Sequence, residues 1–203
     1  PQDHYLARMD FIPASNEVMI QQLNRKQNTN KVFIGNIGTM ALNNIFTDTD
    51  KAFLDIHDDT RWLDQEKYFT FTSERDGWSH LYRISRDGKD IRLITKGDFD
   101  VVQINCIDAK NGYVYYIASP QNFTQRYLFR SRLDGTGKPE QVTPAAMAGQ
   151  SSYQVSGDAK WAIQTFQNAA TPQVTSLVSL PANKEIRKLE DNQQQKEKYD
   201  QLG

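Results

Sequence analysis

The stretch Tyr68–Thr95 reads YFTFTSERDGWSHLYRISRDGKDIRLIT and contains three short strand-like runs separated by polar turns. The first run, Tyr68–Ser73, mixes aromatic with hydroxyl side chains, and the second, His80–Ile84, is rich in aliphatic and aromatic ones. The third run, Ile91–Thr95, follows the pair Asp87-Gly88, which tolerates the positive φ that tight hairpins require. Because β-branched and aromatic residues favour strands, this stretch predicts an antiparallel meander.

The same outline occurs four times along the chain. Corresponding strands start at Val18, Tyr68, Tyr113 and Trp161, which are 50, 45 and 48 residues apart. One further strand-like stretch precedes each start, so each repeat has four strands, which is typical of a β-propeller blade. We therefore predict an all-β protein, a β-propeller fragment of about four four-stranded antiparallel blades, over residues 6–47, 53–95, 101–143 and 152–189. The alternative is a β-sandwich, but nothing in a sandwich makes strands repeat in fours.

Two more turn pairs fit this blade pattern. Asn111-Gly112 is expected to join a first strand to a second, and Asp134-Gly135 a third to a fourth. Four blades are the lower limit for a closed propeller, so we expect an open arc cut from a longer protein. Such an arc would expose apolar blade faces at both ends, which makes self-association of the chain an expectation as well.

The composition excludes several classes of function. The 203 residues include 24 Lys and Arg and 25 Asp and Glu, for a net charge of −1. No overall positive field is therefore available for nucleic acid or an anionic membrane, and no apolar run approaches the roughly 18 residues of a membrane-spanning helix. The single cysteine, Cys106, permits neither an intrachain disulfide nor a cysteine-based zinc site, and we expect it to be a small buried apolar residue.

The sequence lacks the motifs of a catalytic or cofactor site. Serine hydrolases of the α/β type carry Gly-x-Ser-x-Gly, and the nearest match, Gly149–Tyr153, lacks the second glycine. His57-Asp58-Asp59 could offer metal ligands, but no further ligand stands at a suitable spacing. We therefore expect no catalytic residue, no metal and no cofactor. An acidic run is expected to be solvated surface and comprises Asp48, Asp50, Asp55, Asp58, Asp59 and Asp64.

Three motifs go beyond the generic blade. Ser73–Tyr82 reads SERDGWSHLY and is followed by Ile94-Thr95-Lys96-Gly97. Tyr5-Leu6 with Gln21–Asn28 (QQLNRKQN) forms the second motif, and Leu189–Asn192 (LEDN) the third. In this order the three resemble the N-terminal β-propeller of the dipeptidyl peptidase IV family, in the prolyl oligopeptidase clan.

The resemblance implies a place in a larger enzyme. Residues 1–190 would be the later blades of an eight-bladed propeller, and residues 191–203 a polar linker, or a short helix, toward an α/β-hydrolase domain. Such enzymes remove N-terminal dipeptides after Pro or Ala, and the propeller restricts access of short peptides to the hydrolase domain. The paired glutamates that hold the peptide ammonium in this family are absent from the sequence, which has no Glu-Glu.

The resemblance also implies candidate substrate contacts. The loop that ends in Arg61-Trp62 resembles a segment near the family's specificity pocket, so His57, Asp58 and Arg61 are candidate substrate-binding residues. The alternative is that Trp62 is blade core and Arg61 forms a salt bridge at the rim. By resemblance, the expected setting is bacterial and periplasmic or secreted. A rival function is a stand-alone propeller that binds proteins; sequence beyond Gly203 would separate the two.

Overall fold

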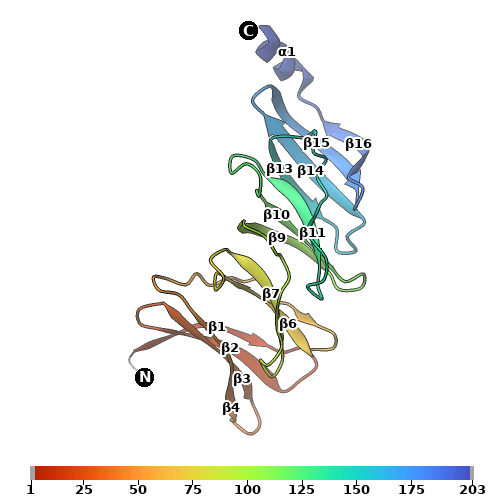
Figure 1. The fold of residues 1–203 in the computed structure, drawn as a ribbon. Helices are drawn as coiled ribbons and strands as arrows, with labels where there is room; N and C mark the ends of the chain where they lie inside the picture. The colour runs from red at the N-terminus through yellow and green to blue at the C-terminus, as the bar shows by residue number, and fades with distance from the viewer. Residues whose placement is uncertain (1–2, 202–203) are drawn as a thin grey trace. The chain divides into compact units, whose positions relative to one another are not determined.

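The computed structural model describes residues 3–201, and almost all regular structure in this range is β-strand (Figure 1). The strands form four antiparallel sheets of four strands each, and each sheet follows the order of its strands in the chain. This confirms the predicted all-β class and the repeat of four-stranded blades. The chain divides between Ile94 and Thr95 into two compact units, with two sheets in each.

The first unit contains a long sheet followed by a shorter one. The first sheet comprises β1 (His4–Phe11), β2 (Glu17–Asn24), β3 (Thr29–Asn36) and β4 (Leu42–Thr49). The second sheet comprises β5 (Trp62–Leu63), β6 (Tyr68–Ser73), β7 (His80–Ser85) and β8 (Ile91–Leu93).

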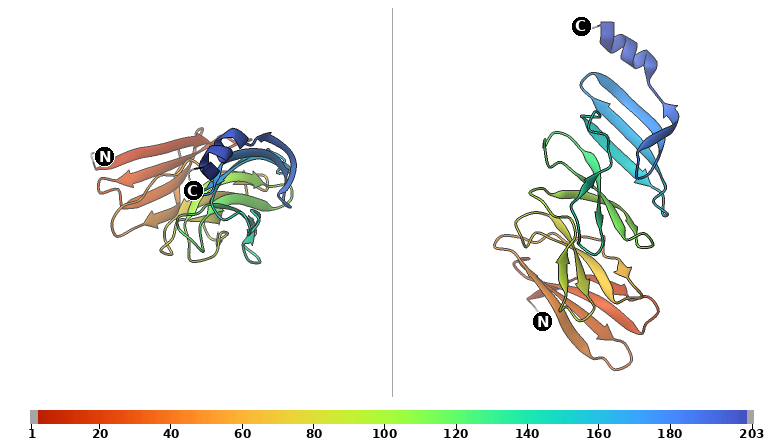
Figure 2. Two further views of the ribbon diagram at one scale, coloured as in Figure 1. Left: turned by 90° about the horizontal axis from the view of Figure 1, so that it is seen from above. Right: turned by 45° about the vertical axis from the view of Figure 1, so that its right-hand side comes forward.

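The second unit contains the other two sheets and the single helix of the described residues. The third sheet comprises β9 (Val101–Asp108), β10 (Tyr113–Ala118), β11 (Tyr127–Arg132) and β12 (Glu140–Gln141). The fourth comprises β13 (Gln150–Val155), β14 (Trp161–Asn168), β15 (Thr171–Ser179) and β16 (Lys184–Glu190). Helix α1 (Gln193–Gln201) lies beyond the end of the sheet at which β16 finishes (Figure 2). Pro1, Gln2, Leu202 and Gly203, which the predicted domain boundaries include, lie outside the described residues.

The glycines of the predicted turns adopt the left-handed conformation. Gly88, Gly112 and Gly135 have φ values of 73°, 74° and 72°. Gly88 also lies close to the first sheet, because a Cβ atom added there would be 1.7 Å from the carbonyl oxygen of Ile45. Only glycine fits at that position on both grounds.

The first strand of the second sheet is much shorter than the predicted stretch of residues 53–63. Only Trp62 and Leu63 pair with β6, and residues 51–61 carry no strand. The backbone amides of the missing part bond elsewhere. The Asp50 carboxylate accepts the N–H groups of Ala52 and Phe53, at 2.6 and 3.2 Å, and the amide of Leu54 donates to the carbonyl of Gln27. These local bonds compete with the ladder, as Asp side chains commonly do.

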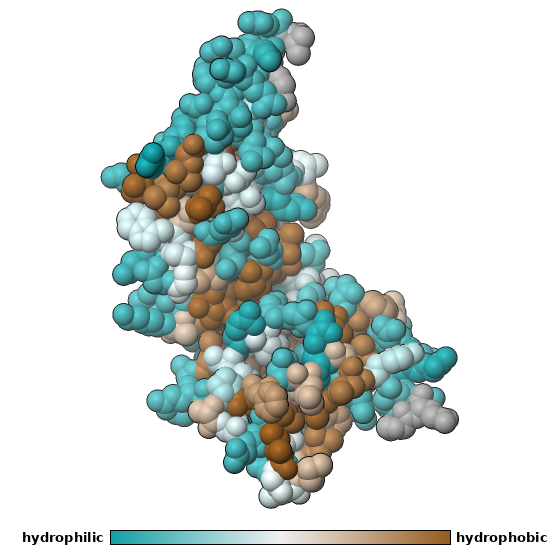
Figure 3. All heavy atoms as spheres, turned by 180° about the vertical axis from the view of Figure 1, so that it is seen from behind, coloured by the Kyte–Doolittle hydropathy of each residue, from teal (hydrophilic) through white to brown (hydrophobic). Residues whose placement is uncertain are grey.

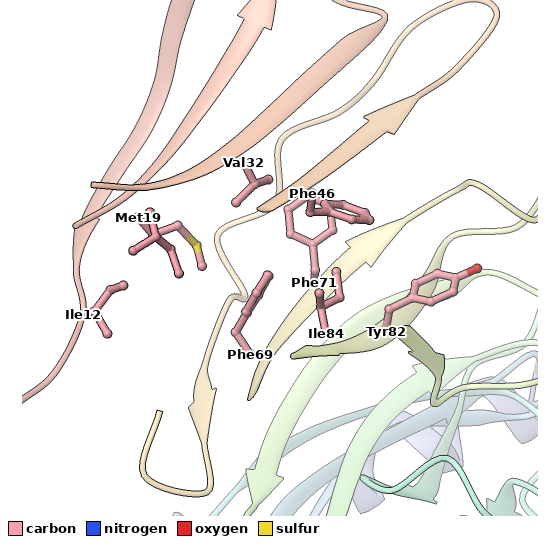
Figure 4. Close-up of a cluster of buried hydrophobic side chains, with 9 residues drawn as sticks. Ile12, Met19, Val32, Phe46, Phe69, Phe71, Tyr82 and Ile84 are labelled. Atoms are coloured by element: carbon pink, nitrogen blue, oxygen red, sulfur yellow. The ribbon is translucent and has the colours of Figure 1, made fainter. Parts of the chain in front are cut away.

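The core of the first unit is formed by apolar side chains from both of its sheets (Figure 4). Val32 and Phe69 are 0% exposed, and the rings of Phe46 and Phe71 meet edge to face with centroids 5.1 Å apart. Because adjacent side chains on a strand point to opposite faces, this cluster uses only one face of the first sheet.

The core of the second unit combines apolar side chains with a hydrogen-bonded network. Leu128 and Val178 are buried beside Tyr153, whose hydroxyl lies 2.8 Å from both Thr143 Oγ1 and Gln164 Nε2. Asn183 Nδ2 donates to Gln164 Oε1 at 3.2 Å, which extends the network. Burial raises the pKa of Tyr153 to about 12, although these hydrogen bonds lower it in part. Each of these side chains thus has at least one buried hydrogen-bond partner, although the Oδ1 atom of Asn183 has none.

Candidate functional site

The segment that carries the candidate substrate contacts links β4 to β5. In a four-stranded meander, the turn between the second and third strands and the link to the next sheet leave from the same end. Residues 50–61 therefore lie at the end of the first unit that also carries the β2–β3 and β6–β7 turns. The sequence places the SERDGW motif at this end too, because Glu74–Ser79 forms the β6–β7 turn.

Two threonines of β6 fix the second half of the segment. The amide of Arg61 donates to Thr70 Oγ1 at 2.8 Å, and the amide of Thr70 donates to the Arg61 carbonyl at 2.9 Å. Thr72 Oγ1 donates to a carboxylate oxygen of Asp59 at 2.6 Å. Three bonds to a central strand hold residues 59–61 in place, although these residues have no regular secondary structure.

Asp58 and Arg61 are in contact, but the guanidinium of Arg61 does not pair with the carboxylate of Asp58. Asp58 forms an ion pair with Arg8 of β1, and Arg8 Nη2 lies 3.1 Å from Asp58 Oδ2. The hydrogen bond from Arg8 lowers the pKa of Asp58. Arg61 instead donates through Nη1 to the carbonyls of Thr60 and Asp58, at 2.7 and 3.3 Å. Half-buried His57 lies near enough for its charge to lower the pKa of Asp58 as well.

Sequence reasoning missed Arg8 because it lies 50 residues before its partner. It was also wrong about one member of the acidic run. Asp48 is 3% exposed and accepts a hydrogen bond from Ser73 Oγ at 2.9 Å, with Arg75 Nε at 3.9 Å. Burial raises the pKa of Asp48 despite these partners. Its place in the polar end of β4, Thr47-Asp48-Thr49, gave no sign of burial, because its partners Ser73, at the end of β6, and Arg75, in the β6–β7 turn, come from the next sheet.

Arg75 is held against aromatic rings at the same end of the unit. Its guanidinium carbon lies 4.8 Å from the ring centroid of Phe46 and 5.9 Å from that of Tyr82. Nearby, the buried ring of His80 lies 2.9 Å from Asp76 through Nδ1. His80 thus lies on β7 and its ring is hydrogen-bonded within the same sheet.

The structure gives no scaffold for a serine nucleophile at the nearest sequence match. Gln150–Val155 forms β13, an edge strand, so Ser151 lies on a strand and not on the sharp strand-to-helix turn of a nucleophile elbow. Within residues 3–201, no three His, Cys, Asp or Glu side chains converge on a possible metal position.

Cys106 is half-buried, and its thiol contacts the carbonyl of Ser156 at 3.6 Å. Burial raises the pKa of this thiol, which opposes formation of a reactive thiolate. Helix α1, the one helix in the described range, is too short and too polar to cross a membrane.

Curated relatives are dipeptidyl peptidases of much greater length. A probable dipeptidyl-aminopeptidase B of Coccidioides posadasii is 31% identical over 116 residues, which are 56% of this chain and 12% of the relative. A protein of the same description from Emericella nidulans is 27% identical over 194 residues, 88% of this chain and 21% of the relative. The chain thus spans about a fifth or less of these two relatives.

Solved structures agree with the fold. The crystal structure of Porphyromonas gingivalis dipeptidyl peptidase 4 matches 95% of this chain, and 28% of its own, with a TM-score of 0.81 and 27% identity. A putative dipeptidyl aminopeptidase IV from Bacteroides ovatus matches 93% of this chain and 29% of its own, with a TM-score of 0.78 at 19% identity, and so supports the fold alone. The model of the dipeptidyl peptidase IV N-terminal region matches residues 1–173, and the chain therefore belongs to that family.

Proposed function

We propose that this chain is the non-catalytic propeller region of a serine peptidase that removes N-terminal dipeptides after Pro or Ala. The observation that carries the proposal is the family match over residues 1–173, in a chain where the nearest serine motif lies on an edge strand. The relatives' names supply the reaction, and their greater length leaves room for a separate hydrolase domain. Residues 1–190 would be the propeller part, and 191–203, mostly α1, the link to that domain.

The physical role of the propeller would be to select substrates by size. Stacked four-stranded sheets are rigid, so an opening framed by them admits an extended peptide and excludes a folded protein. The test uses the intact parent peptidase with two substrates that share an N-terminal Gly-Pro, a short peptide and a folded protein. We expect kcat/KM for the folded protein to be at least a hundredfold lower. Equal values would contradict the gating role.

For peptide recognition, we propose that His57, Asp58 and Arg61 contact the substrate. The three bonds from Thr70 and Thr72 support this role, because a loop held on a central strand can present its side chains in a fixed geometry. Asp58 is already paired with Arg8, so Arg61 and His57 are the members with more freedom to bind a peptide.

The test for this site is an Arg61→Ala variant of the intact parent. We expect KM to rise several-fold with little change in kcat, because the contact is made equally in the ground and transition states. Arg132→Ala is the matched control, since Arg132 is an exposed arginine in the other unit that pairs with Asp134. Unchanged kcat/KM in Arg61→Ala, or an equal effect in the control, would count against the site.

The cellular location of the parent enzyme can also be proposed. We propose a periplasmic or secreted bacterial enzyme, supported by the bacterial source of the Porphyromonas gingivalis structure, which is 27% identical to this chain. The curated relatives cited above are fungal. Fractionation of the source cells, followed by immunoblotting for this chain, tests it. Recovery of the chain in the cytoplasmic fraction alone would contradict it.

A further inference from the structure

The second unit contains a cavity of about 360 Å³ to which the proposed function assigns no role. It is lined by residues of β9, β13, β14 and β15, together with Ile117 of β10 and Arg126. Hydrophobic side chains reach the molecular surface at several places (Figure 3), so apolar exposure alone does not single out a site. This cavity is distinguished by its chemistry, because Arg126 is the only charged residue among the described residues that line it and most of the others are polar and neutral.

Half-buried Arg126 is held by one of the two terminal nitrogens of its guanidinium. Its Nη1 donates to Ser119 Oγ at 2.8 Å and to the carbonyls of Phe123 and Gln125, both at 3.0 Å. These acceptors lie in the connection between β10 and β11. Within residues 3–201, Nε and Nη2 have no hydrogen-bond partner and no carboxylate pairs with this arginine. The guanidinium therefore has a fixed position and one open edge.

Two other arginines of the same unit show what this edge of a guanidinium binds. Arg130 donates through Nε and Nη2 to a carboxylate oxygen of Glu140, at 2.9 and 2.6 Å. Arg132 uses the same two nitrogens to donate to Asp134 Oδ2, at 3.2 and 3.0 Å. The planar edge matches the geometry of a carboxylate, and such charge-assisted hydrogen bonds are the strong ones. Arg126 thus offers a carboxylate site for which the described residues supply no carboxylate.

The other walls of the cavity suit a short peptide. Each glutamine amide has both donors and an acceptor, so it can bond to the N–H and C=O groups of a peptide backbone. Val102 and Ile117 add apolar surface for a side chain. A cavity of this volume is near the lower end of the range for small-molecule sites, so its ligand is small. Four glutamines line the cavity, namely Gln103, Gln150, Gln167 and Gln173.

The two sheets of the second unit converge beside this cavity. Strand β13 lies against both β9 and β11, and Asn105 Nδ2 of β9 donates to the carbonyl of Tyr153 in β13 at 2.8 Å. Because the blades of a propeller surround a central channel, the strands at which adjacent sheets converge would face that channel. All lining residues come from the second unit, so the walls need no other blade, and further blades of the parent would leave the channel side open.

We propose that this cavity binds a short peptide through its C-terminal carboxylate, with Arg126 holding the carboxylate. The ligand class rests on the proposed function, because the dipeptides that the parent would release carry such a carboxylate. The site belongs to the second unit, whereas the candidate substrate contacts His57, Asp58 and Arg61 belong to the first. No bond is formed or broken here, so the site acts by binding alone.

The test is calorimetric titration of the chain with the dipeptide Gly-Pro and with Gly-Pro amide, which lacks the carboxylate. We expect saturable binding of one Gly-Pro per chain and an affinity for the amide that is lower by about tenfold or more, since hydrogen bonds to a charged group are lost. No binding of Gly-Pro, or equal affinity for both ligands, would overturn the proposal. Binding is read as heat without turnover, so its failure is distinguishable from failure of the proposed peptidase function.

A first pair of variants tests the arginine. Arg126→Gln should lower the affinity for Gly-Pro by about tenfold or more, because the glutamine amide carries no charge. Arg187→Gln is the matched control, because Arg187 is exposed on β16 and does not line the cavity. Unchanged affinity in Arg126→Gln, or an equal loss in the control, would contradict the assignment.

A second pair covers the case in which Arg126→Gln fails to fold. Gln103→Glu adds a negative charge to the cavity and leaves Arg126 with its three bonds in place. It should also weaken Gly-Pro binding by about tenfold, because like charges repel and the new carboxylate competes for Arg126. Gln154→Glu makes the same change on β13 at an exposed residue outside the lining and should leave the affinity unchanged. Full binding by Gln103→Glu would place the ligand elsewhere and overturn the proposal.

Discussion

Each unit packs two four-stranded sheets together, but the side chains buried between the sheets differ between the two units. Between the sheets of the first unit, an apolar cluster with fully buried Phe69 and Val32 is accompanied by two separate buried polar pairs, Asn30–Gln21 and Ser73–Asp48. Between those of the second, the hydroxyl of Tyr153 and the amides of Gln164 and Asn183 form a buried network. Both units therefore combine an apolar cluster with buried hydrogen bonds, but the bonds are separate pairs in the first unit and one connected network in the second. Members of a connected network depend on one another, so the second interior should be more sensitive to the loss of a single polar group.

The largest loss of stability is expected from a substitution in the apolar cluster of the first unit. Phe69→Ala removes a fully buried ring between the two sheets of the first unit and should reduce the free energy of unfolding by about 3–5 kcal/mol. Chemical denaturation followed by tryptophan fluorescence measures this loss. Phe53→Ala is the control, since Phe53 is 52% exposed and should change stability little. A loss below about 1 kcal/mol in Phe69→Ala would show that this interior is not tightly packed.

A smaller effect should follow when the network of the second unit is broken. Tyr153→Phe keeps the ring but removes the hydroxyl that Gln164 and Thr143 share. Buried partners left without a hydrogen bond cost about 1–3 kcal/mol, which thermal unfolding should detect.

Tyr5→Phe provides the matched control, because Tyr5 is 45% exposed and its loss should be close to zero. If Tyr153→Phe were as stable as the unchanged chain, the contrast between the two interiors would fail.

The third expected effect is a pH dependence of stability that is caused by the buried carboxylate of Asp48. Because burial raises the pKa of Asp48, the folded state disfavours its charged form. The stabilising contribution of this group is complete below the unfolded pKa of about 3.9 and is lost as the pH rises through the folded value.

Asp48→Asn stays neutral at every pH and can still accept the bond from Ser73. We expect its unfolding free energy, relative to the unchanged chain, to increase between about pH 3 and pH 7. Denaturation series at several pH values measure this difference. A difference that falls with rising pH would mean that Asp48 is stabilised as an anion by Arg75.

The smallest effect is expected at the surface of the first unit. Arg8→Gln removes the ion pair with Asp58, and both side chains are exposed. Solvent and salt screen such pairs, so stability should remain unchanged within error. The pKa of Asp58, followed by NMR titration, should rise toward its ordinary value, since the Arg8 hydrogen bond is the main cause of its lowering. An unmoved pKa would show that the pair is absent in solution.

The sequence was sufficient for features that repeat or that depend on neighbours along the chain. The aromatic runs predicted sixteen strands in four sheets within the described residues, and the Asp-Gly and Asn-Gly pairs predicted the positive φ of Gly88, Gly112 and Gly135. Such features follow from local propensity, which each residue carries in itself.

Features that depend on distant partners could not be predicted. The burial of Asp48 needs Ser73, which is 25 residues away, and the Arg8–Asp58 pair spans 50 residues. Tyr153, Gln164 and Asn183 meet only because three elements of the second unit fold together. The short β5 was missed for another reason, because side-chain bonds of Asp50 replaced the expected ladder. Polar side chains have several possible partners, and only the fold selects one.

The chain belongs to the N-terminal propeller region of its family, and we propose that bond cleavage takes place in another part of the parent peptidase. The most direct measurement is incubation of the purified 23.3 kDa chain with a chromogenic Gly-Pro substrate, beside the intact parent peptidase at equal concentration. We predict release of chromophore by the parent and none above the buffer blank by the chain. Turnover that follows the chain through successive purification steps would contradict the claim.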